Sequence, residues 1–181
     1  MTKKLKKLEI GSGGRPREGY IHLDAWAAVK PDILWDATNI PYPFKENELD
    51  EIYSHWVLEH FSVRDIERII PEWERILKPG GKVIAVTNNQ EAHNKCLQDK
   101  KITWEEWCRL TYGVREPGEI TGYRPVDVWE CHKIGWTEER LRNTFTRHGF
   151  QVEKIITGWE CRMPDGGIKC PGLTITAIKP T

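Results

Sequence analysis

The chain has 181 residues, of which 39% are hydrophobic, and its 27 Lys and Arg side chains balance 27 Asp and Glu side chains. This length predicts one domain over residues 1–181, and the balanced charge excludes a strong overall attraction to nucleic acid. No apolar stretch is long enough to span a membrane and the first residues lack the apolar centre of a secretion signal, so we expect a cytoplasmic protein.

Seven short runs of β-branched and aliphatic residues predict strands. In chain order they are 6–10, 20–24, 32–36, 50–54, 82–87, 150–157 and 173–179. Apolar residues at helical spacing predict helices over 63–77, 103–112 and 138–148, with Ser62, Thr103 and Thr137 as capping residues. Strands that alternate with helices indicate an α/β domain with a mostly parallel sheet, and the last two strands should pair antiparallel.

Three glycines, Gly11, Gly13 and Gly14, directly follow the first predicted strand. Glycine lets a backbone come close to a ligand at the carboxyl end of a parallel strand, where nucleotides bind. Asp24 ends the next strand, so its carboxylate would lie beside the loop and accept hydrogen bonds from two ribose hydroxyls. A tight surface turn is the alternative interpretation.

Further segments extend this pattern. E-x-G-x-G stands at 9–13, and WDATNIPYPF, SHWVLEHF and ILKPGGKVIAV follow in that order. The ordered set resembles the class I S-adenosylmethionine-dependent methyltransferases, in particular the small type-11-like branch, over nearly the whole chain. The resemblance implies a Rossmann-like seven-stranded sheet and S-adenosylmethionine as the cofactor. We expect the last strand to be antiparallel and to lie between the fifth and the sixth.

The resemblance also implies roles for individual residues. The residues that match cofactor-binding positions are Glu9, Gly11, Ser12, Gly13, Asp24, Asp36, Ala37, Ser54 and His55. Asp36 would accept from the adenine amino group, with the amide of Ala37 beside it. Leu58, Glu59 and His60 match the L-E-H signature of the family, although the same residues also fit the start of a helix.

Two features depart from the family pattern. Arg15 replaces the third glycine of the loop, and could reach the cofactor carboxylate, reach an acidic substrate, or lie in solvent. The connection between Gly11 and Leu23 is also too short for a full crossover helix, since a parallel crossover needs roughly a dozen residues or more. We therefore expect the first helix to be reduced to a turn or lost.

Methyl transfer to a hydroxyl requires an in-line arrangement, exclusion of water and a base. Polar residues on the loops after the fourth and later strands are the candidates: His55, Asn88, His93, Tyr112, Tyr123, Asp127 and His132. We select His132 as the base and His55 as the second candidate, because imidazole titrates near neutral pH. A hydrogen-bonded loop histidine without a chemical role is the alternative for each.

Residues 88–136 form the longest stretch without a predicted strand. This stretch contains four tryptophans, Trp104, Trp107, Trp129 and Trp136. Aromatic rings stack on sugars, so we expect a lid over the acceptor site, although the same rings could cover the core. The expected function is O-methylation of a saccharide or another small polar metabolite.

Several alternatives are left open by the sequence. The chain could be an N-methyltransferase acting on a small amine, or a catalytically silent cofactor-binding subunit. A nucleic-acid base methyltransferase is not expected, because SHWVLEH stands where an N/D-P-P-Y/F loop would be. A nicotinamide-binding domain is disfavoured, because G-x-G-x-x-G lacks its last glycine and Asp24 comes too early. The oligomeric state is not predicted.

Five cysteines at positions 96, 108, 131, 161 and 170 form an odd set without a C-x-x-C pair. This spacing predicts neither a disulfide framework nor a zinc knuckle. No metal site is therefore expected from the sequence.

Overall fold

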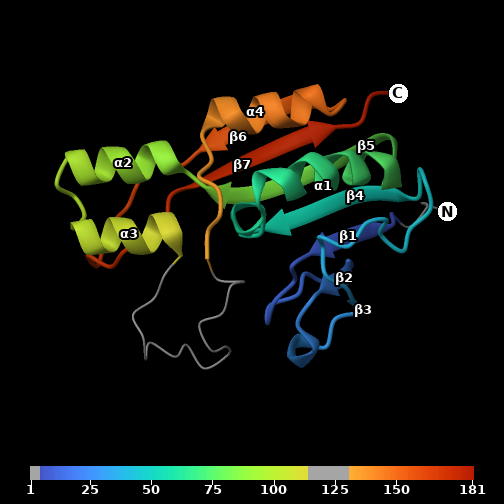
Figure 1. Cartoon of the computed structure of the whole chain (residues 1–181), viewed down its shortest axis with the longest axis horizontal. Helices are drawn as coiled ribbons and strands as arrows, with labels where there is room; N and C mark the ends of the chain where they lie inside the picture. Colours follow the sequence, from blue (N-terminus) through green and yellow to red (C-terminus); the bar gives the residue numbers. More distant parts are fainter. Residues whose placement is uncertain (1–4, 114–130) are drawn as a thin grey trace.

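One seven-stranded sheet, in the order β3-β2-β1-β4-β5-β7-β6, forms the centre of the fold (Figure 1). The fold is that of a computed structural model, which describes residues 5–113 and 131–181. The strands are β1 (Lys7–Ile10), β2 (Ile21–Asp24), β3 (Ile33–Leu34), β4 (Leu49–His55), β5 (Leu77–Asn88), β6 (Gln151–Thr157) and β7 (Gly172–Ile178). All seven predicted strands and the α/β class are confirmed.

The pairing of the strands places the loops that matter at one edge. β1 pairs parallel with β2 and β4, β2 with β3, and β4 with β5. β7 runs antiparallel between β5 and β6, as the sequence predicted. Ile10 lies level with Ser54, and Ser54 with Ala85, so the segments after β1 to β5 all leave the sheet on one side. We call this side the carboxyl edge.

Four α-helices are described: α1 (Val63–Ile76), α2 (Gln90–Gln98), α3 (Trp104–Tyr112) and α4 (Glu138–Arg147). Ser62, Thr103 and Thr137 cap α1, α3 and α4 by accepting backbone N–H groups, as predicted. α2 and α3 lie beyond the carboxyl ends of β4 and β5 (Figure 1). No helix in the described ranges is long and apolar enough to cross a membrane.

α2 was not predicted from the sequence. Its residues are mostly polar, and Ala92 and Cys96 are the apolar side chains that it buries, so it shows little of the apolar spacing that marks a helix. The helix begins after Asn89, whose side chain accepts the N–H of Ala92. His93, expected on a loop, is therefore a helical residue, and it is fully buried.

The main core lies between the sheet and the pair α1 and α4. Trp73 of α1 and Phe145 of α4 are fully buried, with ring centroids 6.5 Å apart, so both helices cover the same face of the sheet. Trp136 belongs to this core and is also fully buried. It therefore packs in the core, and the stretch 88–136 does not present all its tryptophans to an acceptor.

The opposite face of the sheet carries polar side chains. Residues 11–20 contain no α-helix, which confirms that the first helix of the family pattern is lost. On this face Glu51 lies 3.6 Å from Lys7 Nζ and 3.2 Å from Lys82 Nζ, and it accepts the hydroxyl of Tyr20. Burial by itself raises the pKa of Glu51, but the hydrogen bonds from Tyr20 and Lys82 and the lysine charges outweigh burial and lower it.

A smaller apolar cluster connects α2 to the segment that follows β6. Cys96 and Cys161 form a disulfide there, packed with Ile102 and Leu110. The cysteine spacing did not predict this bond, because its partners are 65 residues apart and meet only through the tertiary fold.

Candidate functional site

The glycine loop after β1 is closed on one side and open on the other. Gly11 has a φ of +70°, and a Cβ there would lie 2.4 Å from Cγ2 of Val57, in the turn after β4. Its N–H donates to the carbonyl of Leu23 at 2.8 Å. A Cβ on Gly13 or Gly14 would meet nothing within 4 Å. The loop therefore packs tightly against the turn after β4 while its backbone at Gly13 is accessible to a ligand.

Two buried carboxylates fix the shape of this loop. Asp24 Oδ2 accepts the N–H of Gly13 at 2.9 Å, and Oδ1 accepts that of Trp26 at 2.8 Å. Glu9 Oε2 accepts the N–H of Arg17 at 2.7 Å, so Glu9 holds the loop from inside. Because a carboxylate oxygen can accept more than one hydrogen bond, Asp24 retains capacity for ribose hydroxyls.

The segment after β3 lies beside Asp24. The N–H of Trp35 donates to the carbonyl of Asp24 at 2.9 Å, which brings Asp36 to the carboxyl edge. Asp36 Oδ1 accepts the backbone N–H and the hydroxyl of Thr38, both at 2.8 Å, and the carbonyl of Ala37 accepts the hydroxyl of Tyr42. Asp36 and Ala37 are partly exposed, which fits a binding surface for a planar ring.

Ser54 and His55, at the end of β4, have different surroundings. Ser54 lies on the helix-covered face; it is fully buried, and its Oγ has no hydrogen-bond partner among the described residues. His55 is exposed and packs against Tyr53 and Trp56, with ring centroids 6.2 and 5.6 Å away. Partial burial and then the charge of Arg17 lower the pKa of His55 below its ordinary value.

The predicted base, His132, lies beside the turn η2 (Leu58–His60), which follows β4. The N–H groups of Lys133 and Ile134 donate to the carbonyl of Glu59 at 2.7 and 3.3 Å, and this pairing brings the rings of His60 and His132 to 5.0 Å between centroids. Thr87, near the end of β5, donates its hydroxyl to Glu59 Oε2 at 2.9 Å. We call Glu59, His60 and His132 the edge cluster.

Burial controls the protonation of this region. It raises the pKa of Glu59 to about 7, and hydrogen bonds from its own N–H and from Thr87 offset only part of the effect. Burial also lowers the pKa of His132, and hydrogen bonding to the backbone of Thr111 and Leu110, which raises this pKa, offsets only part of the effect. Burial and then the nearby His132 lower the pKa of His93 to about 4. His132 and His93 therefore carry little positive charge at neutral pH.

The sequence predicted a chemical role for His132 but none for Glu59. The signal that could have found Glu59 is an ionisable residue inside the apolar run V-L-E-H-F. His55 is not part of the edge cluster, and Asn88 and His93 are fully buried. Tyr123 and Asp127 lie outside the described residues.

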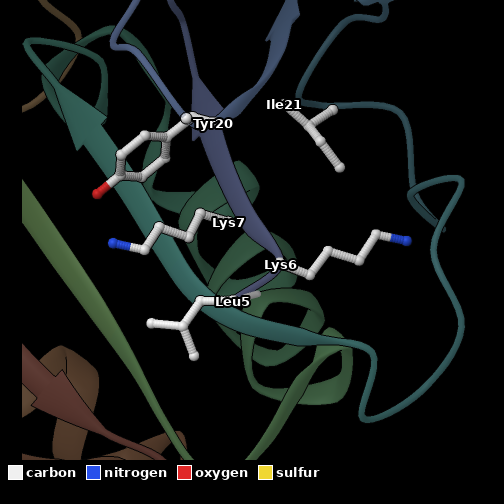
Figure 2. A pocket seen from close by; sticks show the side chains of 6 residues that line it. Leu5, Lys6, Lys7, Tyr20 and Ile21 are labelled. Carbon is white, nitrogen blue, oxygen red and sulfur yellow. The ribbon is translucent and has the colours of Figure 1, made fainter. Parts of the chain in front are cut away.

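A hollow of about 400 Å³ is found at the opposite edge of the sheet, where β1 and β2 begin (Figure 2). Leu5, Lys6, Lys7, Gly19, Tyr20 and Ile21 line it. Lys6 and Lys7 already pair with Glu48 and Glu51. None of the residues that line it was predicted to bind cofactor or acceptor, so this hollow is not the candidate site.

Comparison with known families identifies the fold and the chemistry. A family model for a methyltransferase domain, Methyltransf_11, matches residues 23–85, from the end of β2 into β5. The matched range includes Asp24, Asp36 and the L-E-H turn. The chain therefore carries a segment of a type-11 methyltransferase domain. It is an enzyme that uses S-adenosylmethionine, as the resemblance implied. No curated protein matches the chain.

Solved structures of methyltransferases have the same fold. The chain is similar to an S-adenosylmethionine-dependent methyltransferase from Methanosarcina mazei, with 21% identity, a TM-score of 0.67, and 99% of this chain and 94% of that chain covered. A methyltransferase from Bacillus halodurans is 13% identical with a TM-score of 0.67, and 100% of this chain and 95% of that chain are covered. The 1,6-didemethyltoxoflavin-N1-methyltransferase of Burkholderia thailandensis, solved with bound 1,6-didemethyltoxoflavin and S-adenosylhomocysteine, is 12% identical with a TM-score of 0.60, and 99% of this chain and 72% of that chain are covered.

Proposed function

We propose that this methyltransferase methylates a hydroxyl oxygen of a saccharide or of a similarly polar small metabolite. The observation that carries the proposal is the position of His132. This imidazole lies beside η2, and Val57, one residue before η2, touches the cofactor loop at Gly11. A group that can accept a proton therefore lies at the same edge as the loop.

The carboxyl edge fits the cofactor. Asp24 would hold the ribose hydroxyls, the backbone of Gly11–Gly13 would face the methionine part, and Asp36 with Ala37 would border the adenine. When bound, S-adenosylmethionine supplies a methyl group on a positively charged sulfur. The chain holds the acceptor in line with that methyl group and excludes water from it.

The hydroxyl proton needs an acceptor within the site. His132 is the first candidate, because a ring nitrogen there can take the proton while the hydroxyl oxygen forms its new bond to carbon, and can then release the proton to water. His55 at the end of β4 is the second candidate. Both rings have a pKa below the ordinary value, so both are neutral at neutral pH.

The exposed aromatic side chains of α3 favour a saccharide as the acceptor. Trp104 is 59% exposed and stacks on Trp107 at 4.9 Å between centroids. Tyr112, at the end of the same helix, accepts the N–H of His132 through its carbonyl at 2.9 Å. Exposed rings of this kind bind the apolar faces of sugars. We therefore propose that the stretch 88–136 contributes the acceptor site, with Trp136 excepted because it packs in the core.

Labelled S-adenosylmethionine incubated with a panel of saccharides, polyols and small amines tests the proposal. Methyl transfer to a saccharide or polyol is expected. His132→Ala should lower turnover by roughly 10²–10⁴-fold and leave the affinity for S-adenosylhomocysteine almost unchanged. The control is His148→Ala, at the end of α4, which should retain full activity.

Three results would contradict the proposal. Turnover with amines alone would make the enzyme an N-methyltransferase. Cofactor binding without turnover on any acceptor would favour a silent subunit. Full activity of the His132→Ala enzyme would transfer the role of base to His55 or remove it.

A further inference from the structure

The edge cluster brings two imidazoles and a carboxylate together from segments far apart in the chain. Glu59 and His60 come from η2, and His132 comes from the segment before α4. One potential ligand atom from each of the three residues lies within 4.8 Å of the others. Two backbone hydrogen bonds, from Lys133 and Ile134 to the carbonyl of Glu59, hold the two segments together.

We propose that Glu59, His60 and His132 bind one divalent transition-metal ion, of the kind represented by Zn²⁺ and Mn²⁺. Two imidazole nitrogens with one carboxylate oxygen form a donor set that binds such ions and leaves positions open for a further ligand. Glu59 is fully buried while His60 and His132 are partly exposed, so the ion would be reached from the side of the histidines.

The two oxygens of the Glu59 carboxylate differ in their hydrogen bonding. Its Oε2 accepts the hydroxyl of Thr87 at 2.9 Å. Its Oε1 is fully buried and has no hydrogen-bond partner within the described part of the chain. Leaving a buried carboxylate oxygen unpaired is costly, and a bound cation removes that cost. This unpaired oxygen is an observation independent of the spacing of the three residues.

His132 also has a buried ring atom without a partner. Its backbone N–H donates to the carbonyl of Tyr112 at 2.9 Å, which ties the residue to the end of α3. Its buried Nδ1 has no partner among the residues described. A neutral imidazole carries its proton on one nitrogen and a lone pair on the other, so the unpaired Nδ1 can serve as a ligand atom when the proton is on Nε2.

A cation at this site would bind the acceptor during methyl transfer. This step of the inference rests on the proposed function. Val57 contacts the cofactor loop at Gly11, and Glu59 follows two residues later. The open positions of the ion would then bind a hydroxyl oxygen of the acceptor, or two neighbouring oxygens of a diol. With an ion bound, His132 would be a ligand and not the base, so His132→Ala would lower turnover in either case and the metal titration decides between the two roles.

Metal titration of the tag-free chain, stripped with a chelator, tests the site without any acceptor. We expect ZnCl₂ or MnCl₂ to bind at one ion per chain by calorimetry and to raise the melting temperature. With CoCl₂, the protein should show the absorption spectrum of a Co²⁺ ion bound by nitrogen ligands. Glu59→Gln and His132→Asn should each weaken binding by at least about 10-fold. Circular dichroism confirms that each variant is folded.

Cys131→Ser and His93→Asn are the matched controls, because one neighbours His132 in the chain and the other is a buried histidine outside the cluster. Both should bind the ion as the wild type does. Absence of binding by the wild type, or equal binding by Glu59→Gln and His132→Asn, would overturn the metal site. Loss of binding in Cys131→Ser would assign the ion to a thiol and would also overturn it.

Binding of S-adenosylhomocysteine in the same samples separates this inference from the proposed function. A failed metal site leaves cofactor binding intact, and a failed methyltransferase assay leaves the metal titration unaffected. If an acceptor has been found, its methylation should fall when the ion is removed and recover when it is restored. Turnover that is indifferent to the chelator would overturn the link between the ion and the acceptor.

Discussion

Replacing Gly11 by alanine tests how tightly the cofactor loop packs against the turn after β4. The added Cβ would lie 2.4 Å from Cγ2 of Val57, far inside normal contact. The φ of +70° is also unfavourable for any residue with a side chain. We therefore expect Gly11→Ala to destabilise the fold and to weaken cofactor binding.

The magnitude has two parts. The left-handed conformation costs a residue with a Cβ about 1–2 kcal/mol. Overpacking against a β-branched neighbour adds about 1–3 kcal/mol. The free energy of unfolding should thus fall by about 2–5 kcal/mol. Gly13→Ala is the matched control: its φ of +54° is also left-handed, but a Cβ there meets nothing within 4 Å, so only the first part applies.

Equilibrium unfolding in urea measures both variants, together with Val57→Ala and the double variant Gly11→Ala/Val57→Ala. Removing the valine methyl groups should recover the overpacking part, as a coupling of about 1–3 kcal/mol in the double-mutant cycle. Equal losses for Gly11→Ala and Gly13→Ala, or a cycle without coupling, would refute the packing argument. Calorimetry with S-adenosylhomocysteine on the same proteins should show weaker binding for Gly11→Ala.

Three further predictions follow from other contacts. Asp24→Ala should weaken S-adenosylhomocysteine binding by about 1–3 kcal/mol through lost ribose hydrogen bonds, and an unchanged affinity in calorimetry would reject that role. The pKa of Glu51 lies below its ordinary value of 4.5 in the folded chain. Its ionised carboxylate therefore stabilises the fold at pH values above 4.5. This stabilisation is lost as the pH falls through the lower pKa of the folded state. Glu51→Gln should therefore be less stable at neutral pH, with urea midpoints that converge with the wild type in acid; a constant difference would contradict this. Reducing Cys96–Cys161 should lower stability by about 2–4 kcal/mol, with Cys108→Ser as a control that responds to reductant like the wild type, and an unmoved midpoint would refute it.

The strands were predictable because their signals are local. Ile10 and Leu23 belong to short apolar runs bounded by turn residues, and such runs end where the sheet ends. The order of the strands came from the family resemblance, since periodicity gives no pairing. The loss of the first helix could be predicted from the length of one connection, because the segment after Gly11 is too short to hold a crossover helix.

The features that the sequence did not reveal depend on contacts between distant segments. Glu59 and His132 become neighbours only because Lys133 and Ile134 pair with the turn after β4. The Cys96–Cys161 disulfide has the same origin. α2 was not predicted for a different reason. Few of its residues are apolar, so apolar periodicity did not mark the helix, and the capping residue Asn89 was the signal that could have marked its start.

A crystal structure with S-adenosylhomocysteine tests the location of the site most directly. We predict that the ribose hydroxyls bind Asp24, that the methionine part follows the backbone of Gly11–Gly13, and that the sulfur faces the side on which Val57 and the edge cluster lie. A ligand bound in the hollow beside Lys6 and Lys7, or one that makes no contact with Asp24, would contradict this account.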